Sequence, residues 1–399
     1  MKKKRILFLG GSYAQIPIIE EAKRRGWYII TCDYLPQNPG HKLANEYYNV
    51  STTDKEGVLN LAKKVKPHFI VAYASDPAAP VAAYVSEKIG LEGNPYESIR
   101  ILSEKDLFRF FLKKNGFNTP NSVSITIDDD AFAKIENLKY PIMVKPTDSS
   151  GSKGVSKVNN IDELKKALDY AFSFSRNKRI IAEEFIDNEK GDIHGDGFVI
   201  NGELFFSCLG DHIYNSTINP FNPTGTTWPT KIDKNVVNTI EKEIAEIIHK
   251  TGFKNGPINI EARITKNGTP YVMEIGPRNG GHFVPQAIEY ATGFNMVKAL
   301  LDVLDGKKPE INKDNIKPTA YIAIHSDKSG VLEKLKIDSE IKPYIKEFHQ
   351  YIQPGEKVKS FQGANAAIGI LLLSFHTREE MDYYISNINN FILLKITSE

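Results

Sequence analysis

The sequence predicts an α/β protein that begins with a parallel, doubly wound sheet. Over the first hundred residues, short apolar runs alternate with amphipathic stretches, the pattern of strands covered on both faces by helices. The pattern then changes to hairpins, such as GFVINGELFF turning on Asn201-Gly202, and a β-rich tail runs through AIGILLLSF. Because 399 residues exceed one ordinary core, two or three domains are expected.

The first elements can be justified one by one from their periodicity. RILFLGG predicts a buried strand, AQIPIIEEAKRRG an amphipathic helix closed by Gly26, and WYIITCD a second buried strand. KEGVLNLAKKVK then predicts a helix, HFIVAY a strand and residues 80–89 a further helix. Such alternation favours a parallel sheet.

Composition excludes several classes of protein. Lys plus Arg (51) nearly equals Asp plus Glu (49), and a net charge of +2 offers no broad basic surface for nucleic acid or an anionic membrane. Cys32 and Cys208 make neither a disulfide framework nor a metal motif, which favours a reducing compartment. Since no apolar run suggests a membrane span and the basic start is followed only by ILFL, we expect a cytoplasmic protein.

A glycine turn follows the first predicted strand. Gly10, Gly11 and Ser12 precede a helix, but the dinucleotide fingerprint fails because Ser12 and Gln15 stand where glycines are needed. Three interpretations stay open: a nucleotide such as NAD, a substrate anion at the helix N-terminus, or a tight turn without ligand.

The stretch GPINIEARITKNGTPYVMEIGPRNGGH, residues 256–282, carries the strongest chemical signal. Asn267-Gly268 predicts a two-residue type I′ turn, and that register places Glu261 opposite Glu274. Like charges directly opposed are destabilising unless compensated. A divalent cation would compensate them, and the alternative is a solvated pair splayed into water.

Further cationic and hydrogen-bond-donating residues favour a site for a nucleoside triphosphate over a solvated acidic pair. Arg278 follows in a Gly/Pro-rich turn, where a planar guanidinium can meet phosphate or carboxylate. Upstream, Lys145 ends the apolar stretch YPIMVKP, and the loop SSGSKG adds Lys153 and backbone amides that would cover phosphates. No P-loop sequence is present.

With these residues in this order, about 200 residues of the chain resemble the ATP-grasp superfamily. SEKDLFRFFLKKNGFNTP is similar to the family's entry helix, YPIMVKP to its lysine strand, SSGSKGV to its mobile lid and IIAEEFI to its hinge strand. The resemblance implies a pre-ATP-grasp domain at 1–104, an α+β ATP-grasp domain at 105–312 with a lid subdomain at about 125–190, and a small β-rich domain at 313–399.

The resemblance also implies roles for individual residues. Lys145 and Arg278 would be catalytic, and Glu261 and Glu274 would bind Mg²⁺, with Mn²⁺ as an alternative. Glu183 would accept from the adenine amino group. The ATP-binding set is Lys105, Lys145, Ser150, Gly151, Ser152, Lys153, Gly154, Glu183, Glu184, Phe185, Ile186 and Asp192.

Two departures from the family pattern matter. Gly276 stands where many members have an asparagine as third metal ligand, and Asn259 or Asn279 is a candidate to fill that role in part. The ribose contact is open among Glu189, Asp192 and His194.

The residues predicted to bind substrate are chosen only from their positions in the sequence. It comprises Arg278, Asn279, Gly281, His282, Ser75 and Asp76. His282 could touch substrate, act as a base for the amine or serve a structural role, and Ser75 and Asp76 could bind ligand or cap a helix. The polar-aromatic stretch 210–230 is either a substrate contact or an irregular surface loop.

The predicted function is that of an ATP-dependent carboxylate–amine ligase. A carboxylate would attack the γ-phosphate of ATP, and an amine would displace phosphate from the acyl phosphate, which suits positioned cations. Rival hypotheses are a bicarbonate-phosphorylating enzyme related to carbamoyl phosphate synthetase, a kinase-like relative and a non-catalytic ATP sensor. The expected partners are a small carboxylate and a small amine, with a homodimer as one option for assembly and neither nucleic acid nor membrane as a partner.

Overall fold

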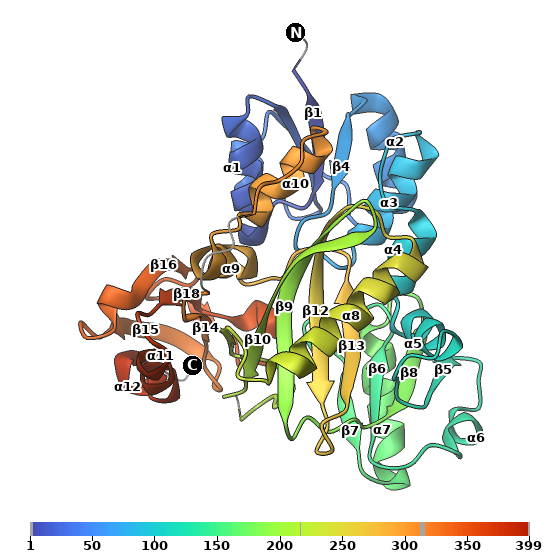
Figure 1. Cartoon of the computed structure of the whole chain (residues 1–399). Helices are drawn as coiled ribbons and strands as arrows, with labels where there is room; N and C mark the ends of the chain where they lie inside the picture. Colours follow the sequence, from blue (N-terminus) through green and yellow to red (C-terminus); the bar gives the residue numbers. More distant parts are fainter. Residues whose placement is uncertain (1–2, 216, 312–315, 398–399) are drawn as a thin grey trace.

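The computed structural model describes residues 3–215, 217–311 and 316–397. Within these residues the fold is mixed α/β, as predicted, with four sheets (Figure 1). The candidate site is surrounded by elements of the N-terminal sheet, the sheet that carries the glycine-rich loop, the largest sheet and the C-terminal segment, which are described in turn below.

The N-terminal sheet is parallel, with strand order β3-β2-β1-β4. Ile6 and Phe8 of β1 pack against α1, whereas Leu7 and Leu9 pack against α2 and α3, so helices cover both faces as predicted. Its elements are β1 (Arg5–Leu9), η1 (Tyr13–Gln15), α1 (Ile16–Arg24), β2 (Tyr28–Cys32), η2 (Pro39–Leu43), β3 (Glu46–Tyr48), α2 (Lys55–Val65), β4 (Phe69–Val71) and α3 (Ala79–Lys88).

A second, antiparallel sheet carries the glycine-rich loop. Its strand order is β5-β8-β6-β7, and the loop joins β6 to β7. Its core is formed with the helix α7. The elements here are α4 (Tyr96–Ser103), α5 (Lys105–Lys114), β5 (Ser122–Thr126), α6 (Ala131–Ile135), β6 (Ile142–Pro146), β7 (Ser156–Val158), α7 (Ile161–Phe174) and β8 (Arg179–Glu184).

The largest sheet has eight strands in the order β13-β12-β9-β10-β11-β14-β18-β16. In Figure 1 the helix α8 lies across the strands at the β13 end. β14, from the C-terminal tail, pairs with β11, and β18 and β16 follow it, so the tail extends this sheet. Its elements are β9 (Gly191–Ile200), β10 (Glu203–Ile213), β11 (Gly225–Trp228), α8 (Lys234–Thr251), β12 (Gly256–Ile264), β13 (Pro270–Gly276), β14 (Thr319–Ile324), β16 (Ile345–Gln350) and β18 (Gly369–Ser374).

The remaining C-terminal elements cover one end of that sheet. Three strands, in the order β17-β15-β19, form a small sheet, and α11 packs its buried face into the same core. The elements are β15 (Gly330–Ile337), η3 (Lys342–Tyr344), β17 (Lys357–Val358), η4 (Ala364–Ala366), α11 (Arg378–Ser386), α12 (Ile388–Phe391) and β19 (Ile392–Thr397).

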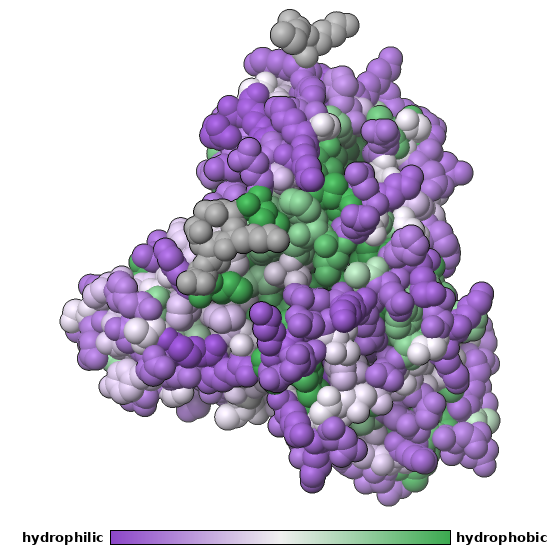
Figure 2. All heavy atoms as spheres, viewed as in Figure 1, coloured by the Kyte–Doolittle hydropathy of each residue, from purple (hydrophilic) through white to green (hydrophobic). Residues whose placement is uncertain are grey.

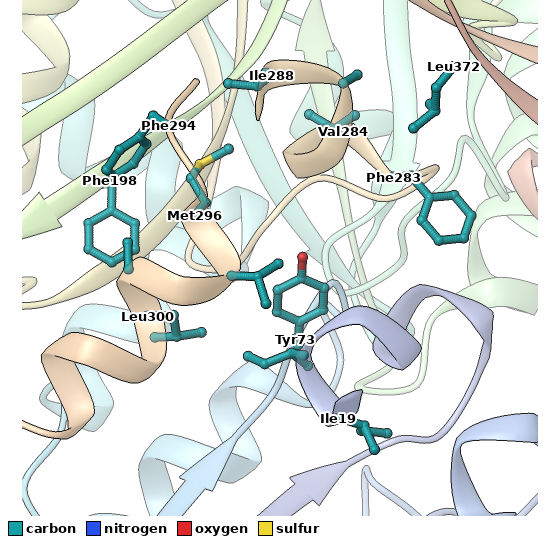
Figure 3. Close-up of a cluster of buried hydrophobic side chains, with 14 of the residues drawn as sticks. Ile19, Tyr73, Phe198, Phe283, Val284, Ile288, Phe294, Met296, Leu300 and Leu372 are labelled. Carbon is teal, nitrogen blue, oxygen red and sulfur yellow. The ribbon is translucent and has the colours of Figure 1, made fainter. Parts of the chain in front are cut away.

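One apolar core joins the N-terminal sheet to the large sheet. In Figure 3, Tyr73 and Ile19 of α1 lie below the helix α9 (Val284–Thr292) and to the right of α10 (Met296–Leu304), with Phe198 of β9 at the left and Leu372 of β18 at the upper right. Burial of such side chains contributes roughly 1.5–3 kcal/mol each, so this core holds the loops at the site in fixed relative positions.

The face of the molecule in Figure 2 is mainly polar, with an apolar hollow between β4 and α10. A cavity of about 510 Å³ there is lined by Phe69, Val71, Leu300 and Leu304. No helix in the described part of the chain is both long and apolar enough to cross a membrane.

Candidate active site

A cavity of about 370 Å³ brings together most of the predicted site residues. It lies where the large sheet, the glycine-rich loop and the loop after β4 meet. The predicted residues that line it are Asp76, Lys105, Lys145, Ser150, Gly151, Ser152, Lys153, Glu183, Asp192, Glu261, Glu274, Arg278, Gly281 and His282. These residues come from separate segments of the chain between positions 76 and 282.

Lys145 is held in place by Glu183. The Lys145 Nζ atom lies 2.5 Å from Glu183 Oε1, on the neighbouring strand β8. The second carboxylate oxygen of Glu183 accepts from Arg109 Nε at 2.8 Å. Burial alone would raise the pKa of Glu183, but the two cations outweigh it and hold the pKa at about 2. The carboxylate that we expected to face adenine therefore lies in a buried ion-pair network.

Arg109 is a site residue that the sequence analysis missed. Its side chain is 2% exposed, and its Nη1 also donates to the Met273 carbonyl at 2.8 Å. A signal was present in the sequence, because Arg109 falls between Phe108 and Leu112 on the buried face of α5. A buried arginine needs a carboxylate partner.

Lys105 connects the glycine-rich loop to the acidic pair. Its backbone N–H donates to the Thr147 carbonyl, and its Nζ lies 3.1 Å from the Ser149 carbonyl and 3.2 Å from Glu274 Oε2. Burial would lower the pKa of Lys105, but Glu274 and Asp76 raise it. The base of the loop is thereby fixed beside Glu274.

The predicted pairing of Glu261 with Glu274 is confirmed. Burial, followed by repulsion from Glu274 and Asp192, raises the pKa of Glu261 to about 7. Lys105 balances part of the negative charge of this half-buried pair, and the carboxylates are oxygen ligands of the kind that Mg²⁺ prefers. Across residues 3–215, 217–311 and 316–397, no group of three or more His, Cys, Asp or Glu side chains is arranged around a metal site.

The turn that was expected to set this register differs from the prediction. Thr265 pairs with Thr269, and Asn267 does not have the positive φ that a type I′ turn requires, so the loop has three residues instead of two. A bulge next to Glu261 restores the register, and Met273 is the extra residue on β13. By contrast, Asn201 and Gly202 both have positive φ, as a type I′ turn requires.

Arg278 is held by a carboxylate from the loop after β4. Its Nε lies 2.5 Å from Asp76 Oδ1 and its Nη2 lies 2.7 Å from Asp76 Oδ2, a bidentate pair. Burial opposes ionisation of Asp76, but Arg278, Lys105 and a hydrogen bond with Ser150 lower its pKa. Asp76 therefore links the N-terminal sheet, the loop and the arginine.

The loop 149–154 lies against two other segments. Ser152 Oγ donates to the Phe221 carbonyl at 2.8 Å, and a Cβ on Gly151 would lie 3.6 Å from Ala364. Gly154 has φ +73°, and a Cβ there would lie 2.8 Å from Pro146, so this position requires glycine. The loop forms one wall of the cavity.

The far end of the cavity is lined by uncharged polar and aromatic residues. The rings of His194 and His212 stack at 4.3 Å, and both contact Thr226 Oγ1 through Nδ1, at 2.9 and 3.2 Å. Burial lowers the pKa of His212 to about 4, although Asp192 and a hydrogen bond with the Gly225 backbone act to raise it. These rings are neutral near pH 7.

Some predicted residues lie outside the cavity lining. The Ser75 carbonyl accepts from the N–H groups of Ala78 and Ala79. Glu184 accepts from Asn121, and the Ile186 carbonyl accepts from Arg263. The set that does not line the cavity is Ser75, Gly154, Glu184, Phe185, Ile186 and Asn279.

The two asparagines considered as metal ligands face another carboxylate. Asn259 Nδ2 donates to Asp196 Oδ1 at 2.8 Å, and Asn279 Nδ2 lies 3.5 Å from Asp196 Oδ2. Their amides thus help to hold the buried Asp196.

The glycine turn after β1 is filled by its own side chains. Gln15 Oε1 accepts from the N–H and the hydroxyl of Ser12, and Gln15 Nε2 donates to the Tyr73 carbonyl. A Cβ on Gly11 would lie 2.3 Å from the His41 ring. Of the three interpretations, this packing favours the tight turn without ligand.

Comparison with known proteins agrees with this geometry. Residues 138–286 match the family described as "ATP-grasp domain". The chain contains an ATP-grasp domain. It is 28% identical over 340 residues to the carbamoyl phosphate synthase large chain of Thermoanaerobacter sp. (strain X514), an alignment covering 81% of this chain and 31% of the relative. The corresponding protein of Pasteurella multocida is 24% identical over 323 residues, with 78% and 30% coverage. The chain thus spans less than a third of the length of these curated relatives.

Solved structures match over the whole chain. An L-amino acid ligase from Bacillus licheniformis has a TM-score of 0.82 at 23% identity and covers 100% of both chains. A phosphoribosylglycinamide synthetase from Anaerococcus prevotii has a TM-score of 0.77 at 20% identity, with 99% and 100% coverage. At these identities the similarity shows a shared ATP-grasp fold.

Proposed function

We propose that this chain is an ATP-dependent carboxylate–amine ligase that forms an amide bond through an acyl phosphate and releases ADP and phosphate. The observation that carries the proposal is one cavity lined by Lys105, Lys145, Arg278 and the opposed pair Glu261 and Glu274. Cations beside an acidic pair fit a nucleoside triphosphate with its metal ion. The resemblance to an L-amino acid ligase over the full chain supports it.

The residues of the chain would act mainly by positioning. Lys105 and Lys145 would neutralise the phosphates, so that the substrate carboxylate can attack the γ-phosphorus while ADP leaves. Glu183 would position Lys145, since both of its oxygens are bound by cations. Glu261 and Glu274 would hold Mg²⁺, or Mn²⁺, which when bound neutralises phosphate charge.

In the second half-reaction, attack of the amine on the acyl phosphate, the acyl group would have to be held in place and water excluded. The amine nitrogen would attack the acyl carbon, the bond to the phosphate oxygen would break, and the amine would lose a proton. Arg278 would bind the carboxylate and then the developing oxyanion. The loop 149–154 would act as the lid, since it already contacts two facing segments and water would hydrolyse an acyl phosphate.

Adenine would lie beside the hinge that follows β8. The backbone of Glu184 and Ile186 would pair with its ring, with Phe185 alongside, and Asp192 would meet the ribose. We further propose the division 1–104, 105–312 and 313–399, with a lid subdomain at about 125–190 and a cytoplasmic location, and a homodimer is one option for assembly. The separate sheet of β5 to β8 supports the lid subdomain.

The test is release of inorganic phosphate from Mg²⁺-ATP in the presence of pooled carboxylates and pooled amines. The proposal predicts release that needs both pools together. Release with a carboxylate alone, or a phosphorylated product without free phosphate, would contradict it.

The carbamoyl phosphate synthase relatives favour a second candidate, phosphorylation of bicarbonate. In the same assay this activity would depend on bicarbonate and would not need another carboxylate. ATP binding with no turnover in any pool would favour the non-catalytic sensor.

A further inference from the structure

Two buried nitrogen atoms that line the far end of the cavity have no hydrogen-bond partner among the described residues. They are Nδ2 of Asn222, whose side chain is 1% exposed, and Nε2 of His212. Buried donors are nearly always satisfied, because leaving one without a partner is costly. Two such atoms in one cavity indicate that a ligand supplies the acceptors.

The hydrogen-bond network assigns the protons of the two histidines. Asn259 Nδ2 is a donor, since it contacts Asp196 Oδ1 and the Gly195 carbonyl, so His194 Nε2, at 3.0 Å, must accept. His194 therefore carries its proton on Nδ1 and donates it to Thr226 Oγ1 at 2.9 Å.

The same chain of bonds continues to His212. When the Thr226 hydroxyl donates to His212 Nδ1, at 3.2 Å, and not to Tyr321, the His212 proton lies on Nε2. The stack with His194, at 10° between ring planes, fixes the ring orientation. In this tautomer His212 presents an N–H donor to the cavity, which the Asn222 side chain also lines.

The surroundings indicate what kind of acceptor fits. The charges that act on His212 are Asp192, which accepts from the Tyr214 hydroxyl at 2.9 Å, and Arg263, whose Nε lies 4.0 Å from Asp192 Oδ2. A ligand carboxylate at this end would meet neutral donors and a neighbouring negative charge. An uncharged oxygen satisfies both donors without that repulsion.

We propose that His212 and Asn222 form a subsite for an uncharged oxygen acceptor, an amide carbonyl or a hydroxyl, on one of the two substrates. This inference rests on the proposed function and narrows its substrate class. One substrate of the ligase would be a small amino acid or acid whose second polar group is neutral, as in L-glutamine, L-asparagine or L-serine.

The test is equilibrium binding by calorimetry without nucleotide, so that the result does not depend on turnover. The panel is L-glutamine and L-asparagine, their charged counterparts L-glutamate and L-aspartate, the apolar L-methionine and L-leucine, and the pair L-serine and L-alanine. We expect at least one amide to bind at least tenfold more tightly than its charged and apolar counterparts. Equal binding by those counterparts would overturn the proposal, and so would no binding by either amide together with no preference for L-serine over L-alanine.

Substitutions test whether His212 and Asn222 are the donors that discriminate between amide and carboxylate. His212→Leu and Asn222→Asp should each remove the discrimination between amide and carboxylate, whereas His212→Gln, which keeps a side-chain N–H, should retain part of it. Thr226→Val keeps the volume but removes the hydroxyl that fixes the His212 proton, so discrimination should fall several-fold. Discrimination unchanged in both His212→Leu and Asn222→Asp would contradict the assignment. Melting temperatures of all variants control for folding.

The proposed ligase function and the proposed subsite would be contradicted by different results. Selective amide binding in a protein that releases no phosphate in any pool would contradict the ligase but not the subsite. Phosphate release that needs a carboxylate and an amine, but is indifferent to a neutral oxygen on either, would contradict only the subsite.

Discussion

The two ends of the central cavity differ in how their polar groups are satisfied. At the end where we propose that the phosphates bind, called the phosphate end, Lys145, Glu183 and Arg109 form a buried ion-pair network at 2.5 and 2.8 Å. At the substrate end, His212 and Asn222 are uncharged and leave donors without partners. One end is therefore organised before any ligand arrives, and the other is completed only by its ligand. This difference suits the proposed pairing of ATP with a second, more specific substrate.

The largest expected effect comes from breaking the network at the phosphate end. Arg109→Met removes one partner of the buried Glu183 and should lower the free energy of unfolding by about 3 kcal/mol, the cost of leaving a buried charge short of a partner. Chemical denaturation measures it. Arg100→Met is the matched control on the neighbouring helix α4, where a 30% exposed arginine pairs with Glu97, and should cost under about 1 kcal/mol. Equal losses in both variants would argue against the network.

Removing the metal ion tests the acidic pair. Chelation of divalent ions, or Glu274→Gln, should lower ATP turnover at least a hundredfold, equivalent to about 2.7 kcal/mol in the barrier. Glu274→Gln should also require more Mg²⁺ for half-maximal rate. Full turnover in excess chelator would rule out a metal role for Glu261 and Glu274.

Lys145→Ala should lower ATP turnover at least tenfold, equivalent to about 1.4 kcal/mol, because the positive charge over the phosphates is lost. Steady-state phosphate release measures this effect. Lys165→Ala removes an exposed lysine of α7 and should leave the rate unchanged. Near-normal turnover in Lys145→Ala would exclude the assigned role.

The smallest expected effect concerns Asp196, the buried carboxylate that Asn259 and Asn279 contact. Burial raises the pKa of Asp196 to about 6, above its ordinary value of 3.8. The folded state thus binds this proton more tightly, and the stabilisation is complete below about pH 4 and lost as pH rises through 6. Denaturation of wild type and Asp196→Asn across pH 4 to 7 should give a stability difference that changes by on the order of 1 kcal/mol. A constant difference would contradict the shifted pKa.

Local patterns in the sequence predicted the phosphate end well. The parallel sheet followed from apolar runs, and the opposition of Glu261 and Glu274 is confirmed. The turn beneath that pair was predicted wrongly, yet the register at the glutamates is right because the bulge at Met273 compensates for the extra turn residue. Asn201-Gly202 and Asn267-Gly268 share a dipeptide but differ in backbone conformation, so tertiary context decides the turn type.

Contacts between distant segments could not be predicted. Asp76 meets Arg278 across 202 positions, and Arg109 meets Glu183 across 74, and no periodicity encodes such pairs. The hydrogen bonds that fix the His212 proton also come from separate strands, β12, β9 and β11. Arg109 could have been suspected from its place on the buried face of α5, but its partner could not.

The most direct test of the account follows oxygen from the carboxylate. Once phosphate release identifies a substrate pair, the carboxylate is labelled with ¹⁸O and the released phosphate is analysed by mass spectrometry. An acyl phosphate transfers one carboxylate oxygen to phosphate when the amine attacks the acyl carbon, so the account predicts one ¹⁸O per phosphate. Phosphate without label would show that the carboxylate is never phosphorylated, and would contradict the proposed mechanism.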